Sequence, residues 1–267
     1  MIERVDKLMR KSLKFSIITC TWNSEEFIQQ CIDSVLGQDY PYIEYILVDG
    51  GSTDKTLDYI KAIGRPTHLI TNIQGGISKA MNKGIELATG DIVAHLHSDD
   101  YYLLPSVLGE IAKIFEETDA GWVFGKNMRD QGEGPKPEKW IVPRYSYQRL
   151  LKGNFIPHES TFVRRQLLID AGMFSTVWKY GMDYDMWLKL GKLSKPVQLD
   201  LAIGVFREHP NSYSTANADA AFEEDWHIRM NHLGWSPATW IYHYAHYLVR
   251  KQRKRRSVSG EDATTTS

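Results

Sequence analysis

The segment DIVAHLHSDDYY, residues 91–102, is apolar at first and ends in side chains that could do chemistry, namely His97, Ser98, Asp99 and Asp100. Two adjacent carboxylates repel each other, so folding alone gives little reason to place them at the end of an apolar strand. Asp and Ser also favour turns and helix caps, and a cap ahead of Pro105 would account for both. The pattern leaves two interpretations: a capping turn, or a metal site for a phosphorylated ligand.

Polar residues also follow two other apolar runs. The run 14–22 leads into Thr21 and Asn23. The run 42–51 leads into the polar turn that begins at Asp49. When parallel strands are joined by right-handed crossovers, their carboxyl ends meet at one edge of the sheet, where ligands bind. Three polar strand ends at one edge favour a ligand site over three unrelated turns.

The hydrophobic pattern alternates between two periods over the first 130 residues or so. Apolar runs predict strands at 14–22, 42–51, 67–72, 91–97 and 120–128. Helical spacing, with Ser24 as the first N-cap, predicts helices at 24–38, 52–64, 76–90 and 105–118. This alternation indicates an α/β fold, in which helices cover both faces of a mainly parallel sheet.

The second half of the chain has a less regular pattern. Gly, Pro and charged residues at 129–144 predict a mobile loop. Further strands or helices are expected at 153–172, 179–193, 196–209, 217–233 and 237–254, and the end at 259–267 is expected to be disordered. We therefore divide the chain into a first half at 1–128, a second half at 129–235 and a C-terminal segment at 236–267.

The composition is that of an ordinary globular protein, since 42% of the 267 residues are hydrophobic and 24% are charged. The net charge is −1, but six basic residues lie at 250–256, which leaves 26 basic against 33 acidic residues elsewhere. Cys20 and Cys31 have neither CxxC nor metal-ligand spacing and are expected to be buried free thiols in a reducing compartment. No apolar run has the length of a signal peptide or a membrane span, so we expect a cytoplasmic protein.

Missing motifs exclude several classes of enzyme. The turn TCTWNSEE after the first strand contains no glycine, which excludes a dehydrogenase with a Gly-rich dinucleotide-binding turn. A P-loop and a GxSxG nucleophile elbow are absent as well. Carboxylates at a polar strand edge instead suit Mn2+ or Mg2+, which bind one or two carboxylates together with the oxygens of a diphosphate.

Three segments together resemble the family 2 glycosyltransferases over about residues 14–210: SIITCTWNSEEFIQQCIDSVLGQDYPYIEYILVDGGSTDKT, GISKAMNKGIELATGDIVAHLHSDD and GMDYDMWLKL. The resemblance implies the GT-A fold, with a Rossmann-like nucleotide-sugar-binding half at 1–128, an acceptor-binding half at 129–235, and C-terminal helices. It implies an inverting, metal-dependent enzyme that moves a sugar from a nucleoside-diphosphate sugar, a UDP-sugar in the first place, to a hydroxyl of a glycan or lipid-linked acceptor. By analogy alone, the product would be a surface polysaccharide or a glycolipid, and no nucleic acid is expected as a partner.

The resemblance assigns donor-binding roles to the polar strand ends. Thr21 and Asn23 would line the nucleotide site, and Asp49 would hold the base. Two further donor-site positions depart from the family pattern: His97 stands where the D-x-D motif begins, and Lys79 replaces a frequent acidic residue before AMNKG. Both departures remove negative charge or add positive charge near the expected phosphates.

The resemblance also assigns the metal and the proton transfer. Asp99 would be the metal-binding carboxylate of the D-x-D motif. Arg207 and His209 match an R-x-H pattern that would approach the diphosphate, with His209 as a second metal ligand. Asp183 in GMDYDMW would be the catalytic base. Asp185 is its rival, because two carboxylates two positions apart point to different sides of a helix.

Several side chains near these positions keep two interpretations. His158 in IPHEST would contact the acceptor or the donor phosphates, or would be a buried histidine with hydrogen-bond partners. Trp178 and Trp187 would stack on a sugar, or would pack in the core. Arg207 would alternatively pair with an acidic neighbour such as Glu208.

The C-terminal stretch SPATWIYHYAHYLVRKQRKRR combines apolar and aromatic residues at helical spacing with a basic cluster. This combination is typical of an interfacial helix on an anionic membrane surface, and it would place the protein on the inner face of the plasma membrane. The alternative is a helix packed on the protein body with a solvated cationic end.

Two rival functions stay open besides sugar transfer. A sugar nucleotidyltransferase would share the fold and the metal, but it would need a Gly-rich basic loop after the first strand. A non-catalytic homologue that binds nucleotide sugars stays open because of the departures at His97 and Lys79.

Overall fold

The computed structural model describes residues 12–63, 68–138, 141–209, 217–234 and 236–259, with side chains described as far as Gln252. The expectations for the N-terminal residues 1–11 and for the tail after Ser259 lie outside the described residues. The basic side chains at 253–256 lie outside them as well.

Four parallel strands form the first part of the sheet, in the order β3-β2-β1-β4. They are β1 (Phe15–Thr21), β2 (Ile43–Asp49), β3 (His68–Ile70) and β4 (Ile92–His95). Every residue of β1 and β4 is buried, as expected of parallel strands with both faces covered. Because β1 lies between β2 and β4, the order of strands reverses there, and ligands of such sheets bind beside the carboxyl ends at this point.

The rest of the sheet is mixed, and its full order is β3-β2-β1-β4-β8-β6-β9-β5, with β7 paired to β6. The added strands are β5 (Tyr101–Tyr102), β6 (Trp122–Asp130), β7 (Pro135–Pro137), β8 (Thr161–Arg164) and β9 (Val197–Arg207). β8 runs antiparallel to β4 and β6, whereas β9 runs parallel to β6. The α/β prediction is confirmed, but the loop predicted at 129–144 is partly wrong, because β6 continues to Asp130 and β7 folds back onto it.

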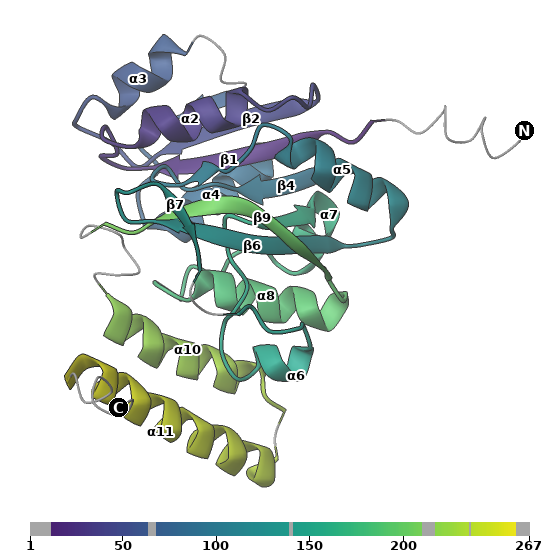
Figure 1. Cartoon of the computed structure of the whole chain (residues 1–267), viewed down its shortest axis with the longest axis vertical. Coiled ribbons are helices and arrows are strands. Elements are labelled where there is room, and N and C mark those ends of the chain that lie inside the picture. Colours follow the sequence, from purple (N-terminus) through teal and green to yellow (C-terminus); the bar gives the residue numbers. More distant parts are fainter. Residues whose placement is uncertain (1–11, 64–67, 139–140, 210–216, 235, 260–267) are drawn as a thin grey trace, which may run out of the picture.

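Helices cover both faces of the sheet (Figure 1). They are α2 (Ile28–Leu36), α3 (Thr56–Ala62), α4 (Ile77–Leu87), α5 (Val107–Glu117), α6 (Tyr147–Leu150), α7 (Arg165–Asp170), α8 (Met182–Leu193), α10 (Ala218–His232) and α11 (Pro237–Ser259). The predicted N-cap Ser24 instead opens a turn ahead of α2. Its carbonyl accepts hydrogen bonds from the backbone N–H groups of Phe27 at 3.1 Å and Ile28 at 2.9 Å.

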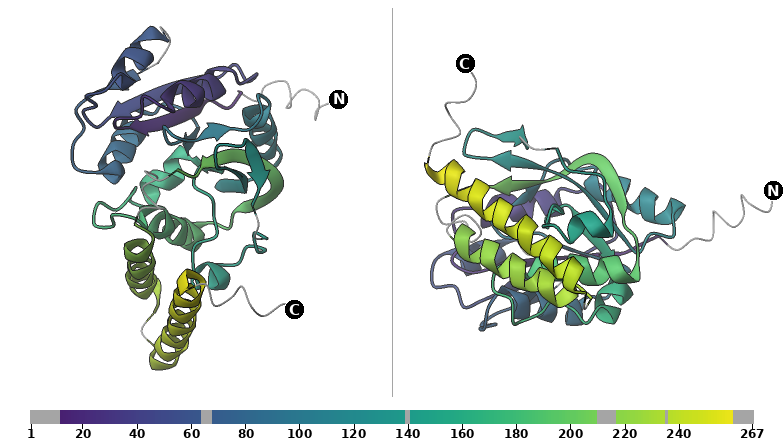
Figure 2. Two further views of the ribbon diagram at one scale, coloured as in Figure 1. Left: turned by 60° about the vertical axis from the view of Figure 1, so that its left-hand side comes forward. Right: turned by 90° about the horizontal axis from the view of Figure 1, so that it is seen from below.

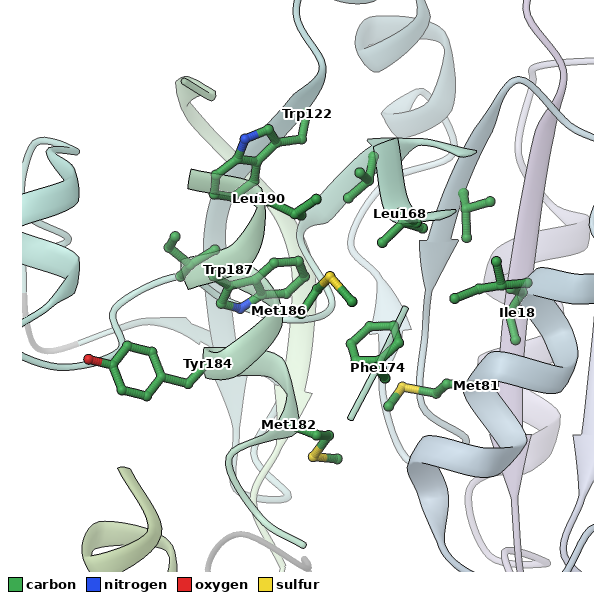
Figure 3. Close-up of a cluster of buried hydrophobic side chains, with 14 of the residues drawn as sticks. Ile18, Met81, Trp122, Leu168, Phe174, Met182, Tyr184, Met186, Trp187 and Leu190 are labelled. Carbon is green, nitrogen blue, oxygen red and sulfur yellow. The ribbon is translucent and has the colours of Figure 1, made fainter. Parts of the chain in front are cut away.

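Two hydrophobic cores lie on the two faces of the sheet, because alternate residues of β1 such as Ile17 and Ile18 belong to different cores. The Ile17 core is filled by α2 and α5. The Ile18 core, drawn in Figure 3, is filled by α4, α7 and α8. In it, Trp122 of β6 stacks on Trp187 of α8 with ring centroids 5.9 Å apart, so Trp187 is a core residue.

The two cysteines are divided between the two cores, Cys20 in one and Cys31 in the other. Both are buried free thiols, as predicted from their spacing. Burial raises the pKa of each thiol to about 12, so neither is a reactive thiolate at neutral pH.

The C-terminal helices extend the molecule on the side of the sheet that carries α8 (Figures 1 and 2). α10 packs on α8, where His232 Nε2 lies 2.8 Å from Oδ1 of Asp185. α11 packs on α10, where Lys251 Nζ lies 2.6 Å from Oε1 of Glu223. Within the described ranges, every helix falls short of the combination of length and apolar content that a membrane crossing requires.

Close packing of α4 on β1 depends on Gly84, because a Cβ atom there would lie 2.4 Å from Cγ2 of Ile18. We expect Gly84→Ala to lower the free energy of unfolding by about 1–3 kcal/mol, as overpacked cores do. Gly109→Ala in α5 is the matched control, since the new Cβ atom would lie 3.5 Å from Oδ1 of Asp39 and alanine favours a helix by about 0.5–1 kcal/mol. Urea unfolding measures both, and a Gly84→Ala protein as stable as the control would contradict the packing.

Candidate active site

The carboxyl ends of β1, β2 and β4 meet at one edge of the sheet. Thr21 at the end of β1 is in register with Asp49 at the end of β2. The hydroxyls of Ser24 and Ser98, which follow β1 and β4, lie 2.8 Å apart. The structure therefore brings together the three polar strand ends that the sequence predicted to converge.

Asp49 has a different environment from the one expected of a residue that holds a base. It is fully buried, and its Oδ2 accepts hydrogen bonds from the backbone N–H groups of Gly51 at 2.8 Å and Ser52 at 3.0 Å. Its Oδ1 accepts a hydrogen bond from the hydroxyl of Ser52. Because both carboxylate oxygens are used inside the turn, Asp49 shapes the turn, and a direct contact with a base would cost one of these bonds.

The residues after β1 offer contacts that Asp49 does not. Thr21 Oγ1 is buried and has no hydrogen-bond partner in the part of the chain that the structure describes. Asn23 has a positive φ of 47°, and its Oδ1 accepts a hydrogen bond from the backbone N–H of Thr53 at 2.9 Å. Trp22, which sequence reasoning missed, is 67% exposed beside Gly50. An aromatic residue at the polar end of a buried strand was the available signal.

Asp99 and His209 lie together at the end of β4, with Asp99 Oδ2 3.1 Å from His209 Nε2. The Asp99 side chain is 28% exposed and that of His209 is 18% exposed, so both are reachable from solvent. The His209 ring packs against Phe27 with centroids 4.7 Å apart. The structure thus joins a pair of residues that are 110 positions apart in the sequence.

Asp99 and His209 suit the predicted metal ion, but they would supply only part of its coordination shell. A carboxylate oxygen and an imidazole nitrogen are both ligands that Mn2+ accepts, and partial exposure leaves room for oxygens of a ligand. Among the described residues there is no group of three or more His, Cys, Asp or Glu side chains that could hold a metal. Asp99 and His209 would therefore need phosphate oxygens or water to complete the coordination.

Arg207 is a structural clamp in this region. Its Nη1 donates to the backbone carbonyl of Asp99 at 2.9 Å, and its Nη2 donates to Oε1 of Gln30. The guanidinium lies over the rings of Phe27, at 4.5 Å, and Tyr101, at 5.1 Å. These contacts hold the loop of Asp99 in place. The contact with a diphosphate predicted for Arg207 would therefore require its guanidinium to give up hydrogen bonds that it makes to Asp99 and Gln30.

Asp100 and Glu159 form a buried pair of carboxyl groups beneath Asp99. Oδ1 of Asp100 accepts a hydrogen bond from the backbone N–H of Arg207 at 2.8 Å, and Glu159 accepts one from Asn127 Nδ2 at 2.6 Å. Burial raises the pKa of Asp100 well above its usual range, and the charge of Glu159 and a hydrogen bond to it add to this rise. Burial and the neighbouring carboxylates thus favour the protonated form of Asp100. Sequence reasoning missed Glu159, since only its position beside His158 could have drawn attention to it.

The imidazoles of His97 and His158 stack in parallel, with centroids 4.6 Å apart and 2° between their planes. His158 is buried, and neither of its ring nitrogens has a hydrogen-bond partner within the described residues. Burial lowers the pKa of His158 well below its usual value, and the charges of His97 and His95 act in the same direction. His158 is therefore a buried neutral imidazole, but the hydrogen-bond partners expected in one interpretation are absent from the described residues, and a contact with acceptor or donor phosphates stays a prediction.

Asp183, the second residue of α8, is the acidic group best suited to accept a proton. Its Oδ2 accepts a hydrogen bond from Asn154 Nδ2 at 2.9 Å, and its Oδ1 accepts one from the backbone N–H of Tyr184 at 2.7 Å. Burial raises the pKa of Asp183 from the usual 3.8 to about 7, and the charges of Asp225 and Glu159 add to the rise. Glu159 thus interacts electrostatically with both Asp183 and the Asp100 side of the site.

Asp185, the rival of Asp183, is engaged elsewhere. Its two oxygens pair with Lys189 Nζ at 2.7 Å and His232 Nε2 at 2.8 Å. Hydrogen bonds from these two partners lower the pKa of Asp185 although its burial opposes the change. A carboxylate held by two cations or donors is a poor base, so the environment favours Asp183.

Lys79 and Trp178, two further residues predicted to belong to the site, have other surroundings. Lys79 is exposed in the first turn of α4, and its side chain passes close to Gly75. Trp178 is half-buried and packs against the core drawn in Figure 3. No contact of either residue with Asp99 or Asp183 is found among the described residues.

Comparison with known sequences gives one family. Its profile, described as "Glycosyl transferase family 2", matches residues 16–169. A "PGL/p-HBAD biosynthesis glycosyltransferase" from Mycobacterium bovis (strain BCG / Pasteur 1173P2) is 32% identical over 181 residues, which is 64% of this chain and 64% of that protein. The chain thus spans less than two thirds of this relative. Chondroitin synthase from Pasteurella multocida (strain Pm70) is 28% identical over 67% of this chain and 19% of its own length.

Comparison with solved structures gives the same fold. S. aureus TarS 1-349 in complex with UDP-GlcNAc superposes with a TM-score of 0.72 over 95% of this chain and 76% of that chain, at 22% identity. The mannosyltransferase PcManGT from Pyrobaculum calidifontis, in complex with GDP-Man and Mn2+, has a TM-score of 0.66 over 92% and 75% of the two chains, at 19% identity. Identities this low support the GT-A architecture alone.

The Asp99–His209 pair predicts that binding of UDP or GDP depends on Mn2+. Asp99→Asn keeps the shape of the side chain and removes its charge, so we expect Mn2+ to strengthen nucleotide binding about tenfold less in the variant, or about 1.4 kcal/mol. Asp119→Asn, at an exposed position before β6, is the control with the same charge change. Calorimetric titration with and without Mn2+ measures the effect, and equal enhancement in all three proteins would return Asp99 to a capping role.

Proposed function

Because the chain belongs to glycosyl transferase family 2, we propose that it transfers a sugar from a nucleoside-diphosphate sugar to a hydroxyl of a glycan or lipid-linked acceptor, with inversion at the anomeric carbon. One observation carries the proposal: Asp183, with a pKa raised to about 7, lies in the same electrostatic network as the acidic loop of Asp99. A base and a candidate metal ligand in one network are what direct displacement of a diphosphate needs.

The donor would bind at the edge formed by β1, β2 and β4. TarS binds UDP-GlcNAc and PcManGT binds GDP-Man, which supports a nucleotide sugar for this chain as well. The exposed ring of Trp22 would stack on the base, while Thr21 Oγ1 and Asn23 would contact the nucleoside. Among nucleotide sugars, we propose a UDP-sugar as the donor.

The residues proposed to hold a metal are Asp99 and His209. A Mn2+ or Mg2+ ion bound there would neutralise charge that develops on the diphosphate leaving group. Lys79 is exposed at the start of α4 and would add positive charge near the same phosphates. Arg207 would act by fixing the loop of Asp99.

Asp183 would remove the proton of the acceptor hydroxyl as the oxygen attacks the anomeric carbon. One carbon–oxygen bond forms while the bond to the diphosphate breaks, and the proton moves to the Asp183 carboxylate. A base with a pKa near the working pH combines the correct protonation state with a useful driving force. Asn154, which donates to Asp183 Oδ2, would keep the carboxylate oriented.

His158 and His97 would contact hydroxyls of the transferred sugar or of the acceptor. Both ring nitrogens of the buried His158 have no partner within the described residues, and unpaired buried polar groups are costly unless a ligand satisfies them. Trp178, half-buried between Val177 and Lys179, would border the acceptor. If transfer requires an acidic residue at the position of His97, the chain would bind nucleotide sugars but would not transfer the sugar.

An Asp183→Asn variant separates these functions. We expect its turnover to fall by about 10²–10⁴-fold, the usual contribution of a general base, while affinity for the nucleotide sugar stays nearly unchanged. The measurement is release of nucleoside diphosphate from a panel of UDP- and GDP-sugars, with and without Mn2+, in the presence of glycan and glycolipid acceptors.

The comparison variant is Asp185→Asn, which should lower the melting temperature because it breaks contacts with Lys189 and His232. Its turnover per folded molecule should stay close to that of the parent. Loss of turnover in Asp185→Asn with normal turnover in Asp183→Asn would reverse the assignment. Absence of diphosphate release from every donor would favour the non-catalytic homologue, whereas release of pyrophosphate from a nucleoside triphosphate and a sugar phosphate would favour the nucleotidyltransferase.

We further propose that α11 lies on an anionic membrane surface where a lipid-linked acceptor would be found. Its inner side packs on α10 through Tyr247, which is buried and donates a hydrogen bond to Glu223, so this residue of the apolar stretch does not face outward. Its outer side exposes the apolar residues Ile241, Leu248 and Val249, and beside them the partly exposed rings of Tyr242, which lies near Lys152, and Tyr244, which packs on Trp226 of α10. Six basic residues at 250–256 come next, of which Arg250 donates to the carbonyl of Lys152 and Lys251 pairs with Glu223. An apolar helix face next to basic residues suits an anionic lipid surface.

The double variant Ile241→Asp/Leu248→Asp tests this surface. We expect it to bind vesicles that contain phosphatidylglycerol at least about tenfold more weakly, because two exposed apolar side chains are lost from the contact. Ile141→Asp/Val177→Asp is the control, since both residues are exposed apolar positions outside α11. Co-sedimentation with vesicles measures binding, and equal binding by the parent and both variants would assign the outer side of α11 to another contact.

A further inference from the structure

The backbone that leads into α8 is held by one carboxylate from α10. Oε1 of Glu224 accepts a hydrogen bond from the backbone N–H of Lys179 at 2.8 Å. Its Oε2 accepts hydrogen bonds from the N–H groups of Tyr180 at 2.5 Å and Gly181 at 2.7 Å. Three successive N–H groups converge on one side chain, an arrangement that binds an anion strongly and fixes the peptide planes.

The position of this contact gives it consequences for the site. Gly181 precedes the first residue of α8, and Asp183 follows two positions later. A Cβ atom on Gly181 would lie 2.5 Å from Cδ1 of Ile228 and 3.3 Å from Oδ1 of Asp225, so α10 approaches the backbone itself. The orientation of Asp183 therefore depends on how α10 is docked.

Asp225, the neighbour of Glu224, brings a negative charge to the same place. The groups that face Asp183 are Asp225 from α10, Glu159 from the segment before β8, the amide of Asn154 and the backbone N–H of Tyr184 on its own helix. After burial, the charge of Asp225 is the largest of the influences that raise the pKa of Asp183. α10 thus contributes both a geometric and an electrostatic influence.

We propose that α10 belongs to the catalytic apparatus: Glu224 positions the start of α8, and Asp225 brings a carboxylate against the backbone at Gly181, two positions before Asp183. The proposal rests on the proposed function, because it takes Asp183 as the group that accepts the acceptor's proton. Glu224 and Asp225 are positioning residues that act through Asp183. They lie beyond the residues 16–169 that match the family profile, so the acceptor side of the site would be completed by elements that the profile does not include.

The electrostatic part can be tested without any substrate. The pKa of Asp183 is higher in the folded protein, about 7, than the usual 3.8 of an unfolded chain, so the folded state loses stability as the pH rises between these values. Asp183→Asn removes that loss and should raise the melting temperature above pH 7, with little change at pH 4. In an Asp225→Asn background the same substitution should raise it less, because the repelling charge is gone.

Glu223→Gln provides the matched control on the same helix. Glu223 pairs with Lys251 and accepts a hydrogen bond from Tyr247, so it faces α11 instead of α8. The gain from Asp183→Asn at pH 8 should be the same in the Glu223→Gln background as in the parent. An equal gain in the Asp225→Asn background would overturn the electrostatic role of Asp225.

The kinetic arm uses the donor and acceptor found in the diphosphate-release assay. Asp225→Asn should move the acid side of the pH profile of kcat/KM to lower pH by up to about one unit, and Glu223→Gln should leave it in place. Glu224→Gln keeps the length of the side chain but cannot offer two anionic oxygens, so we expect kcat to fall about tenfold or more with donor binding unchanged.

Two outcomes separate this inference from the function on which it rests. If Asp183→Asn turns over normally, the base assignment itself fails. If Asp183→Asn is inactive while Asp225→Asn keeps the parent pH profile and Glu224→Gln keeps the parent kcat, the base stands and the role of α10 is refuted.

Discussion

Burial of several carboxyl groups in one electrostatic network is the constraint on which this site depends. Asp100 and Glu159 are both buried, and Asp183 interacts with Glu159 and Asp225. Buried acids are tolerated when a proton or hydrogen-bond donors compensate their charge. Burial raises the pKa of Asp100 well above its usual range, which favours its protonated form, whereas Glu159 receives a hydrogen bond from Asn127. Burial and the charges of Asp225 and Glu159 also raise the pKa of Asp183, which has the hydrogen-bond donors Asn154 and the backbone N–H of Tyr184.

The same compensation fixes how distant parts of the sheet are joined. The backbone N–H of Arg207, the last residue of β9, donates to Asp100 after β4, and its side chain donates to the carbonyl of Asp99. Since His209 follows two residues later, these bonds also bring its imidazole to Asp99. A pair of candidate metal ligands is thus a consequence of a buried acid that needs a donor. The guanidinium of Arg207 is turned toward the protein because it links the end of β9 to the loop that follows β4.

The sequence predicts those features of the fold that have a local pattern. Alternating periods give the parallel strands and their helices, and polar residues after β1, β2 and β4 give the edge where they meet. The resemblance to a family adds Asp99, His209 and Asp183. The sequence does not reveal residues whose role depends on a partner far away in the chain. Glu159 acts through its interaction with Asp100, and Glu224 acts through its hydrogen bonds to the backbone before α8. The turn around Asp49 was readable, since an Asp often accepts hydrogen bonds from N–H groups two and three residues later.

A division of labour between the two parts of the chain follows from these contacts. On the proposed function, nucleotide binding at the edge of β1, β2 and β4 would require the same geometry whatever the acceptor is, and the family profile covers those strands. The proposed acceptor side would have to allow different contacts and still keep Asp183 aligned with the reacting carbon. Glu224 would meet both demands, because it binds the backbone N–H groups of Lys179 and Tyr180 and not their side chains. On the proposed reaction, residues next to the base can therefore change with the acceptor while the position of Asp183 stays the same.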